Sequence, residues 1–377
     1  MGGRAQRTRR GRGGGVAGVL GLAALAALAW AARDVPAALG GRLAGARAER
    51  VRRSPQFHDG AFHNPADVRT TIADPGRNLV WELLFGQQRR RPTRPVPLLR
   101  PSPGSGDERE LAVVWYGHAS ALVEIEGRRV LVDPVWSDRC SPSQVVGPRR
   151  LHAPPVRLDE LPPVDAVLIS HDHYDHLDMA TVRRLRDTQS APFLVPLGIG
   201  AHLDRWGVPA DRIVELDWAE SHRVAGLTIT ATAAQHFSGR GLRRDGTLWG
   251  SWVVAGAHRR VFYTGDSGYF PGYAEIGETY GPFDVTLTQI GAYDRAWPNI
   301  HMFPEEAVAA HLDVRGGLLV PVHWCTFNLA LHDWAEPVNR LWREAKARGV
   351  RLAVPRPGER VTVDAPPPVD AWWDHIA

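Results

Sequence analysis

From residue 111 onward the chain alternates short apolar runs with polar turns, a pattern that is typical of β-strands. Turns at Gly117-His118 and Glu126-Gly127-Arg128 separate the first of these runs. The pattern predicts strands at residues 111–116, 121–126, 129–132, 165–169, 228–234, 252–255, 260–264, 285–290 and 318–322. Helix signals occur among them, which indicates an α/β domain. Helices are predicted at residues 179–185 after an Asp178 cap, at 304–312 with Pro304 in the first turn, and at 336–348 before Gly349.

Histidines and aspartates follow several predicted strands directly. The apolar run 165–169 leads into Ser-His-Asp-His-Tyr-Asp-His at residues 170–176, and His236, Asp266 and His323 end later strands. Buried imidazoles and carboxylates need partners, and a divalent metal is the simplest partner for so dense a group. The carboxyl ends of strands are also where open α/β sheets place their chemistry. The sequence therefore predicts a metal centre at one edge of the sheets.

The amino terminus has a different pattern. Arginines at positions 4 to 12 precede an uncharged, Ala- and Leu-rich run at residues 13–32. Its length lies between that of a signal-peptide core and that of a membrane span. We expect residues 1–32 to be a signal anchor, which places the protein in the cell membrane as a single-pass protein with the catalytic domain outside. A cleaved signal with secretion and a soluble Ala-rich helix are the alternatives.

The remaining chain divides by composition. Residues 33–110 read as a juxtamembrane segment and linker, because Ala, Gly and Arg dominate its start and prolines its end. Residues 111–363 form the predicted α/β domain that carries the candidate metal ligands. Residues 364–377 are a tail, in which Trp372-Trp373 is expected to pack on the domain rather than enter a membrane.

The basic charge is confined to the amino terminus. The formal net charge is +4, but residues 1–53 hold eleven arginines against Asp34 and Glu49, so the rest of the chain is near −5. A mildly acidic domain argues against a broad nucleic-acid-binding surface. The two cysteines, Cys140 and Cys325, cannot form a disulfide framework. Cys325, two residues after His323, is expected to be a small buried thiol rather than a ligand.

The ligand order resembles that of the metallo-β-lactamase superfamily. The pattern is His171-x-His173-x-Asp175-His176, then His236, Asp266 within Thr-Gly-Asp-Ser-Gly, and His323. Longer sequence motifs resemble those of N-acyl-phosphatidylethanolamine phospholipase D and its bacterial relatives. These motifs include Trp115-Tyr-Gly-His-Ala119, Leu248-Trp-Gly-Ser-Trp252 and Asp59-Gly-Ala-Phe-His-Asn-Pro65. The resemblance spans about residues 111–363. It implies an αββα sandwich with two metals at the edge of the sheets.

The resemblance also implies a ligand set. His171, His173 and His236 are expected to hold one zinc, and Asp175, His176 and His323 the other. Asp266 is expected to bridge the two ions. Other divalent first-row metals suit the same donors. His118, after the first strand of the domain, is expected to lie beside the ligands rather than among them.

The activity implied is that of a zinc-dependent phosphodiesterase of the phospholipase D type. A hydroxide held between the metals would attack an N-acyl-phosphatidylethanolamine-like lipid, which the anchor would make easier to reach. Asp175 would orient this nucleophile. His301 would contact the phosphate or protonate the leaving oxygen, unless it is a surface or supporting histidine. Tyr174 would donate a hydrogen bond to the phosphate, or simply line the pocket.

Other interpretations stay open. Arg240, Arg243 and Arg244 could attract a phosphate, or they could belong to a solvated loop. A lactone, ester or sugar-phosphate hydrolase of the same fold is the alternative enzyme, because fold and metals do not fix the scissile bond. An anchored binding protein that keeps its metals for stability is a third interpretation.

Overall fold

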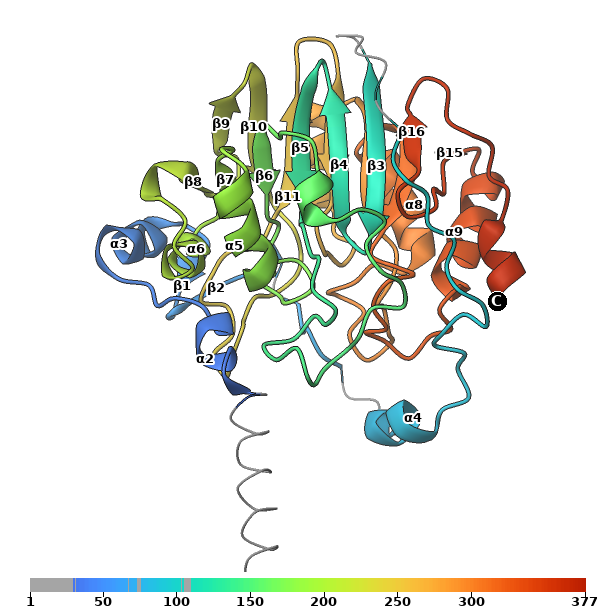
Figure 1. Ribbon diagram of the computed structural model, residues 1–377, viewed down its shortest axis with the longest axis horizontal. Helices are drawn as coiled ribbons and strands as arrows, with labels where there is room; N and C mark the ends of the chain where they lie inside the picture. The colour runs from blue at the N-terminus through green and yellow to red at the C-terminus, as the bar shows by residue number, and fades with distance from the viewer. Residues whose placement is uncertain (1–29, 31, 67, 73–75, 103, 105–109) are drawn as a thin grey trace, which may run out of the picture.

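The computed structural model describes residues 30, 32–66, 68–72, 76–102, 104 and 110–377. Two seven-stranded sheets form its centre (Figure 1). The first sheet has the order β16 (Arg360–Thr362), β3 (Leu111–Gly117), β4 (Ser120–Ile125), β5 (Arg128–Val132), β6 (Ala166–Leu168), β7 (Phe193–Pro196) and β8 (Ile213–Leu216). The second has the order β15 (Arg351–Leu352), β14 (Gly316–Val322), β13 (Phe283–Gln289), β12 (Arg260–Tyr263), β11 (Ser251–Ala255), β10 (Leu227–Thr232) and β9 (Ser221–Val224).

Several strands of the first sheet, among them β3, β6 and β7, are buried on both faces. In β3, Val113 and Trp115 join a core shared with the second sheet, whereas Val114 and Tyr116 join a separate cluster on the other side. This division follows from the strand period of two, which sends successive side chains to opposite faces. A strand covered on both sides must be apolar throughout, which is why β3 and β6 could be predicted from the sequence, although the equally buried β7 was not.

Helices cover the outer face of each sheet. On the first sheet lie α5 (Met179–Thr188) and α6 (Gly200–Arg205), which contribute Val182, Leu185 and Leu203 to the outer cluster. On the second lie α7 (Gly272–Tyr280), α8 (Pro304–Asp313) and α9 (Glu336–Ala347), whose buried residues join the main core. The four layers confirm the predicted αββα sandwich. The Asp178 side chain accepts from the backbone N–H of Ala180 at 3.2 Å, as expected for the cap of α5.

The amino-terminal part of the described chain packs on this sandwich. It contains α2 (Val35–Ala38), α3 (Gly45–Arg53), a small hairpin of β1 (Phe57–His58) and β2 (Ala61–Phe62), and α4 (Leu79–Phe85). Val51 and Phe62 share an apolar cluster with Leu197 and Trp249, and Arg47 forms a salt bridge with Glu215. Residues 35–62, predicted as part of a juxtamembrane spacer, therefore lie against the domain.

The predicted anchor or signal peptide, residues 1–32, lies outside the described residues apart from positions 30 and 32. No helix within the described ranges is both long and apolar enough to span a bilayer. At the other end, Trp372 and Trp373 are buried and contact the ring of Trp324. The expectation that these tryptophans pack on the domain is confirmed.

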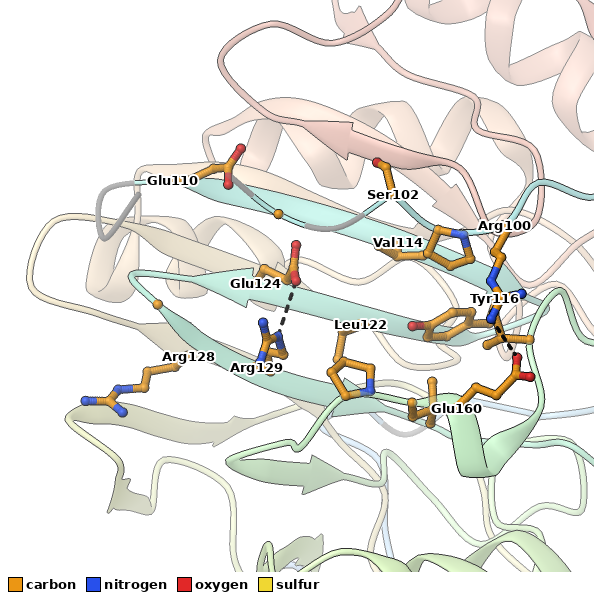
Figure 2. Close-up of a pocket in the computed structure, with 16 residues that line it drawn as sticks. Arg100, Ser102, Glu110, Val114, Tyr116, Leu122, Glu124, Arg128, Arg129 and Glu160 are labelled. Atoms are coloured by element: carbon orange, nitrogen blue, oxygen red, sulfur yellow. Dashed lines mark hydrogen bonds and ion pairs between the residues drawn. The ribbon is translucent and has the colours of Figure 1, made fainter. Parts of the chain in front are cut away.

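A cavity of about 410 Å³ opens on the outer face of the first sheet (Figure 2). Val114, Tyr116 and Leu122 line it, and Glu124 and Arg129 at its side form a salt bridge of 3.3 Å. Glu124 also binds Arg360 at 2.7 Å. These charges are matched among themselves, and the cavity shares no residue with the strand ends that carry the predicted ligands.

Candidate metal centre

The predicted ligands converge at the carboxyl ends of strands from both sheets. His171, His173, Asp175 and His176 lie on the loop of residues 170–177, here called the metal-binding loop, which joins β6 to α5. His236 follows β10, Asp266 follows β12 and His323 follows β14. Within the metal-binding loop, the backbone N–H groups of His176 and Leu177 donate to the carbonyl oxygen of His173 at 3.1 and 2.8 Å. This tight turn points the ligands to one side.

The first group of ligands consists of three imidazoles. The Nδ1 atom of His173 lies 2.8 Å from Nε2 of His171 and 3.2 Å from Nε2 of His236. A tetrahedral zinc with Zn–N bonds of about 2.0–2.1 Å separates its ligands by about 3.3 Å, so this spacing suits one ion. Burial lowers the pKa of His171 and of His236 well below the usual value, and neighbouring histidines lower it further. Neutral imidazoles keep the lone pair that binds a metal.

The second group mixes imidazoles with carboxylates. The Oδ2 atom of Asp175 lies 3.4 Å from Nε2 of His176 and 3.2 Å from Nε2 of His323. The Oδ2 atom of Asp266 lies 3.1 and 3.0 Å from the same two nitrogens. It is also 3.9 Å from Nε2 of His171 in the first group. Asp266 thus lies between the two groups, where a bridging ligand was predicted.

The electrostatics of the second group favour a bound cation. Burial opposes the charge on His323, yet the Asp266 carboxylate raises its pKa to about 9. Conversely, burial would raise the pKa of Asp266, but His176 and His323 lower it well below its usual value. The Oδ1 atom of Asp266 and the Nε2 atom of His176 are buried without a hydrogen-bond partner. A divalent metal satisfies these atoms and replaces the protons that the carboxylates otherwise hold on the histidines.

Asp133 holds the metal-binding loop through hydrogen bonds, and the sequence analysis did not identify it. It directly follows β5 and is fully buried. Its carboxylate accepts from the Ser170 backbone N–H at 2.7 Å and from Nδ1 of His176 at 2.7 Å, and it also binds the hydroxyl of Tyr263. A carboxylate on the far nitrogen of a histidine leaves Nε2 with its lone pair toward the metal. A sequence signal for this role existed, because Asp133 directly follows a predicted strand, as the ligands do.

His118 contacts a ligand carboxylate. Its Nε2 atom lies 2.9 Å from Oδ2 of Asp175. Burial, aided by His323, lowers the pKa of His118 to about 3, so the ring is neutral and Nε2–H can donate to the carboxylate. Its backbone carbonyl oxygen accepts from the N–H of His323 at 2.9 Å. This arrangement suits the predicted place beside the ligands.

The backbone at three strand ends is in the left-handed region. His118, Asp133 and His323 have φ values of 52°, 37° and 64°. Such a conformation costs a non-glycine residue of order 1 kcal/mol or more, and it persists only where surrounding contacts enforce it. At His118 the enforcing contacts include a hydrogen bond of 2.6 Å from its N–H to the hydroxyl of Thr326. Part of the backbone strain in the described chain therefore lies at the candidate metal centre.

Asn64 holds the ligand His236 from the amino-terminal segment. Its side-chain oxygen accepts from the His236 backbone N–H at 2.8 Å, and its side-chain N–H donates to the His236 carbonyl oxygen at 2.8 Å. The Nδ1 atom of His236 lies 2.9 Å from the carbonyl oxygen of Ile300, so Nε2 is left for the metal. Asn64 was noticed only as part of a word shared with related proteins, because nothing in its spacing connects it to a residue so distant in sequence.

A cavity of about 290 Å³ opens over the ligands. Its polar lining includes His173, Asp175, Asp266, His301, Arg244, Thr70 and Thr71, and its apolar lining includes Phe237, Ala292, Trp297, Ile300 and Leu329. The Nδ1 atom of His301 lies 3.9 Å from Oδ2 of Asp266 and has no hydrogen-bond partner. Burial lowers the pKa of His301 to about 3, so its ring is neutral near pH 7. His301 is thus available to a substrate as a hydrogen-bonding group.

The other candidates lie in different places. The hydroxyl of Tyr174 donates to the carbonyl oxygen of Arg240 at 2.7 Å, so its proton is used within the protein. Arg240 is buried, and its guanidinium donates to backbone carbonyl oxygens, so it is not part of a solvated loop. Arg243 and Arg244 are both exposed, and of the two only Arg244 lines the cavity. Cys140 and Cys325 are buried free thiols, and neither belongs to a candidate metal group in the described chain.

Comparison with known proteins agrees with this geometry. The family model described as "Beta-lactamase superfamily domain" matches residues 128–324. An uncharacterized protein of Mycobacterium tuberculosis is 56% identical over 348 residues, which cover 91% of this chain and 93% of that protein. N-acyl-phosphatidylethanolamine-hydrolyzing phospholipase D 1 of Caenorhabditis elegans is 38% identical over 254 residues, which cover 64% of this chain and 71% of that protein.

A solved structure shares the fold. A novel metallo hydrolase from the archaeon Ignicoccus hospitalis superposes with a TM-score of 0.53 at 24% identity. The match covers 67% of this chain and 98% of the archaeal one. At this level of identity the likeness concerns the fold alone. It agrees with the layer order derived from the strand and helix packing.

Replacing Asp133 by Asn tests the support beneath His176. Asparagine keeps the shape but removes the charge and one acceptor, so we expect zinc affinity to fall roughly 10- to 100-fold. Competition with a chromophoric chelator measures this affinity. The matched control is Asp284→Asn. Asp284 lies at the start of β13, away from the ligands, and its carboxylate accepts hydrogen bonds from the Arg259 side chain and the Arg260 backbone N–H. An Asp133→Asn affinity within about twofold of the parent protein would contradict the assigned role.

The metal-free protein should lose stability as pH rises from about 6.5 to 9. His323 has a folded-state pKa of about 9 against 6.5 for the free side chain, so its stabilising contribution is complete below pH 6.5 and disappears as pH passes 9. Urea unfolding of chelator-treated protein at both pH values measures the change. We expect zinc to abolish the fall, because it replaces the proton. A pH-independent unfolding free energy without metal would contradict the assignment.

Proposed function

Because the chain belongs to the metallo-β-lactamase superfamily and is related to N-acyl-phosphatidylethanolamine-hydrolysing phospholipases D, we propose that it is a zinc-dependent phosphodiesterase of that type. It is a metal-dependent hydrolase by family and by its candidate ligands. The proposal adds that it holds two zinc ions and that the substrate is an N-acyl-phosphatidylethanolamine-like lipid. The products are then phosphatidic acid and an N-acylethanolamine.

The ligand groups described above would hold the ions, with Asp266 between them. When bound, two zinc ions supply an activated water and neutralise negative charge on phosphate oxygens. The protein fixes the position of the ligands. The Asp175 carboxylate is held by His118, and the backbone of His236 is held by Asn64. Side chains fixed in this way need little rearrangement when the substrate binds.

The observation that carries the proposal is the mixed lining of the cavity over the ligands. Arg244 lies over the ring of Phe237, 4.7 Å from its centroid, and forms no salt bridge with a carboxylate of the described chain. Trp297, Ile300 and Leu329 supply apolar walls in the same cavity. An unpaired guanidinium suits a phosphate, and apolar walls suit a hydrocarbon chain. A phospholipid carries both groups in one molecule.

His301 completes the cavity next to Asp266. Its low pKa makes it a neutral imidazole at pH 7, which donates through one nitrogen but has no extra proton to give. We therefore assign to it a hydrogen bond to the phosphate or to the leaving oxygen, and not the role of a protonated acid. Tyr174, whose proton is already used by Arg240, is better suited to lining the site than to donating to the phosphate.

The location is part of the same proposal. An anchor at residues 1–32, with the catalytic domain outside the cell membrane, would keep the cavity near a lipid surface. This arrangement needs no soluble carrier for a substrate that stays in the bilayer. The alternative, a secreted domain released by signal cleavage, would have to bind membranes through its own surface.

The direct experiment measures hydrolysis by the zinc-loaded full chain in detergent. The substrates are N-acyl-phosphatidylethanolamine in mixed micelles, a bis-aryl phosphodiester and a lactone, and Asp266→Asn is the inactive control. We expect lipid turnover that the substitution abolishes. Phosphodiester turnover without lipid cleavage would reject the lipid but keep the reaction, and lactone turnover alone would reject the phosphodiesterase proposal.

Arg244→Ala should weaken the binding of phosphodiester substrates specifically. Losing one charge-assisted hydrogen bond costs about 1.5–3 kcal/mol, so we expect KM for the phosphodiester to rise at least about tenfold with little change in kcat. Arg243→Ala removes the same charge from a neighbour that does not line the cavity, and it should leave KM within about twofold. Equal effects of the two substitutions, measured by steady-state kinetics, would show that Arg244 acts only through the general charge of the loop.

A further inference from the structure

We infer that residues 34–41, here called the strap, position the metal-binding loop although they contain no metal ligand. The strap includes α2 and leads from the amino terminus into the domain (Figure 1). Its backbone makes hydrogen bonds with Arg240, His202 and Trp206, and the first two of these side chains also hold the metal-binding loop. The inference goes beyond the proposed function, because it requires a metal centre but no particular substrate.

Arg240 is the first connection between the strap and the loop. Its Nε atom donates to the carbonyl oxygen of Ala38 at 2.8 Å. Its Nη1 atom donates to the carbonyl oxygens of Asp172 at 2.6 Å and Leu177 at 2.8 Å. Asp172 lies between the ligands His171 and His173, and Leu177 follows the ligand His176. One buried guanidinium therefore joins both ends of the ligand run to the strap.

His202 is the second connection. The backbone N–H of Gly41 donates to its Nδ1 atom at 3.0 Å. This bond fixes the tautomer, so that Nε2 carries the proton and donates to Oδ2 of Asp172 at 3.3 Å. The other oxygen of Asp172 accepts from the Gly239 N–H at 2.7 Å. Asp172 is 2% exposed, so water does not replace these contacts.

The strap fits its groove without spare room. A Cβ atom on Gly41 would lie 1.8 Å from the backbone oxygen of Ala201, and one on Gly40 would lie 2.0 Å from Nδ1 of His202. Gly40 also has a φ of +84°, which favours glycine. Trp206 adds a hydrogen bond of 2.8 Å from Nε1 to the carbonyl oxygen of Ala37. Only a chain without side chains at both positions can approach so closely.

The strap therefore acts through other residues on the ligand geometry. With the strap displaced, Arg240 loses one of its carbonyl partners and the Nδ1 atom of His202 loses its donor. The metal-binding loop would then adopt additional conformations, and the ions would leave faster. Residues that support ligands from outside commonly change metal affinity by 10- to 100-fold.

The test uses the zinc-loaded full chain and the variants Gly41→Ala and His202→Phe. The first blocks docking of the strap, and the second removes both hydrogen bonds of the imidazole while keeping a ring of similar size. We expect each to release zinc to excess chelator at least about tenfold faster than the parent protein. The visible absorption bands of the cobalt-loaded variants should also shift, because the ligand geometry changes.

Two controls separate positioning from general destabilisation. Arg42→Ala changes an exposed neighbour of Gly41 and should alter nothing. Val51→Ala makes a cavity in the apolar cluster under α3, so it should lower Tm without changing zinc release or the cobalt bands. Unchanged zinc release in His202→Phe, or an equal acceleration in Val51→Ala, would overturn the inference. If Gly41→Ala does not fold, Trp206→Phe, which removes the hydrogen bond to the Ala37 carbonyl oxygen of the strap, replaces it, and unchanged zinc release in that variant would overturn the inference.

Discussion

The structure depends on one constraint, which is that the imidazoles and carboxylates gathered at one edge of the sheets cannot all satisfy one another. Oδ1 of Asp266 and Nε2 of His176 are buried without hydrogen-bond partners, and burial of such atoms is costly. A cation removes this cost. The same requirement explains why the ligands come from several strand ends, because only the edge of a sandwich brings loops of both sheets to one point.

The surrounding polar residues serve this constraint. Asp133, His118 and Asn64 each bind a ligand residue, and they come from different parts of the chain. Arg240 and His202 extend the support outward to the amino-terminal strap. A metal centre held on several sides is rigid, and rigid ligands allow a metal to act on a substrate without rearrangement. The described residues 34–64 therefore pack as part of the same domain as the metal centre.

Sequence patterns predicted the centre of the molecule better than its periphery. Doubly buried strands such as β3 and β6 are continuous apolar runs, and each predicted ligand follows such a run, so the fold and the metal groups were legible. Short elements were not. In β9 the residues Ser221–Val224 include no fully buried side chain, and α6 has under two turns, so neither gives a clear periodic signal. The roles of Asn64 and Arg240 depend on contacts between distant segments, which no local pattern reveals.

The central claim is that Asp266 lies between two metal sites, and counting bound metal tests it most directly. Zinc is titrated into chelator-treated full chain by calorimetry, and the bound metal is counted by mass spectrometry for the parent protein and for Asp266→Ala. The account predicts close to two zinc ions per chain in the parent, and weaker binding of both ions in the variant. Saturation of the parent at a single ion, with full hydrolytic activity, would contradict the account.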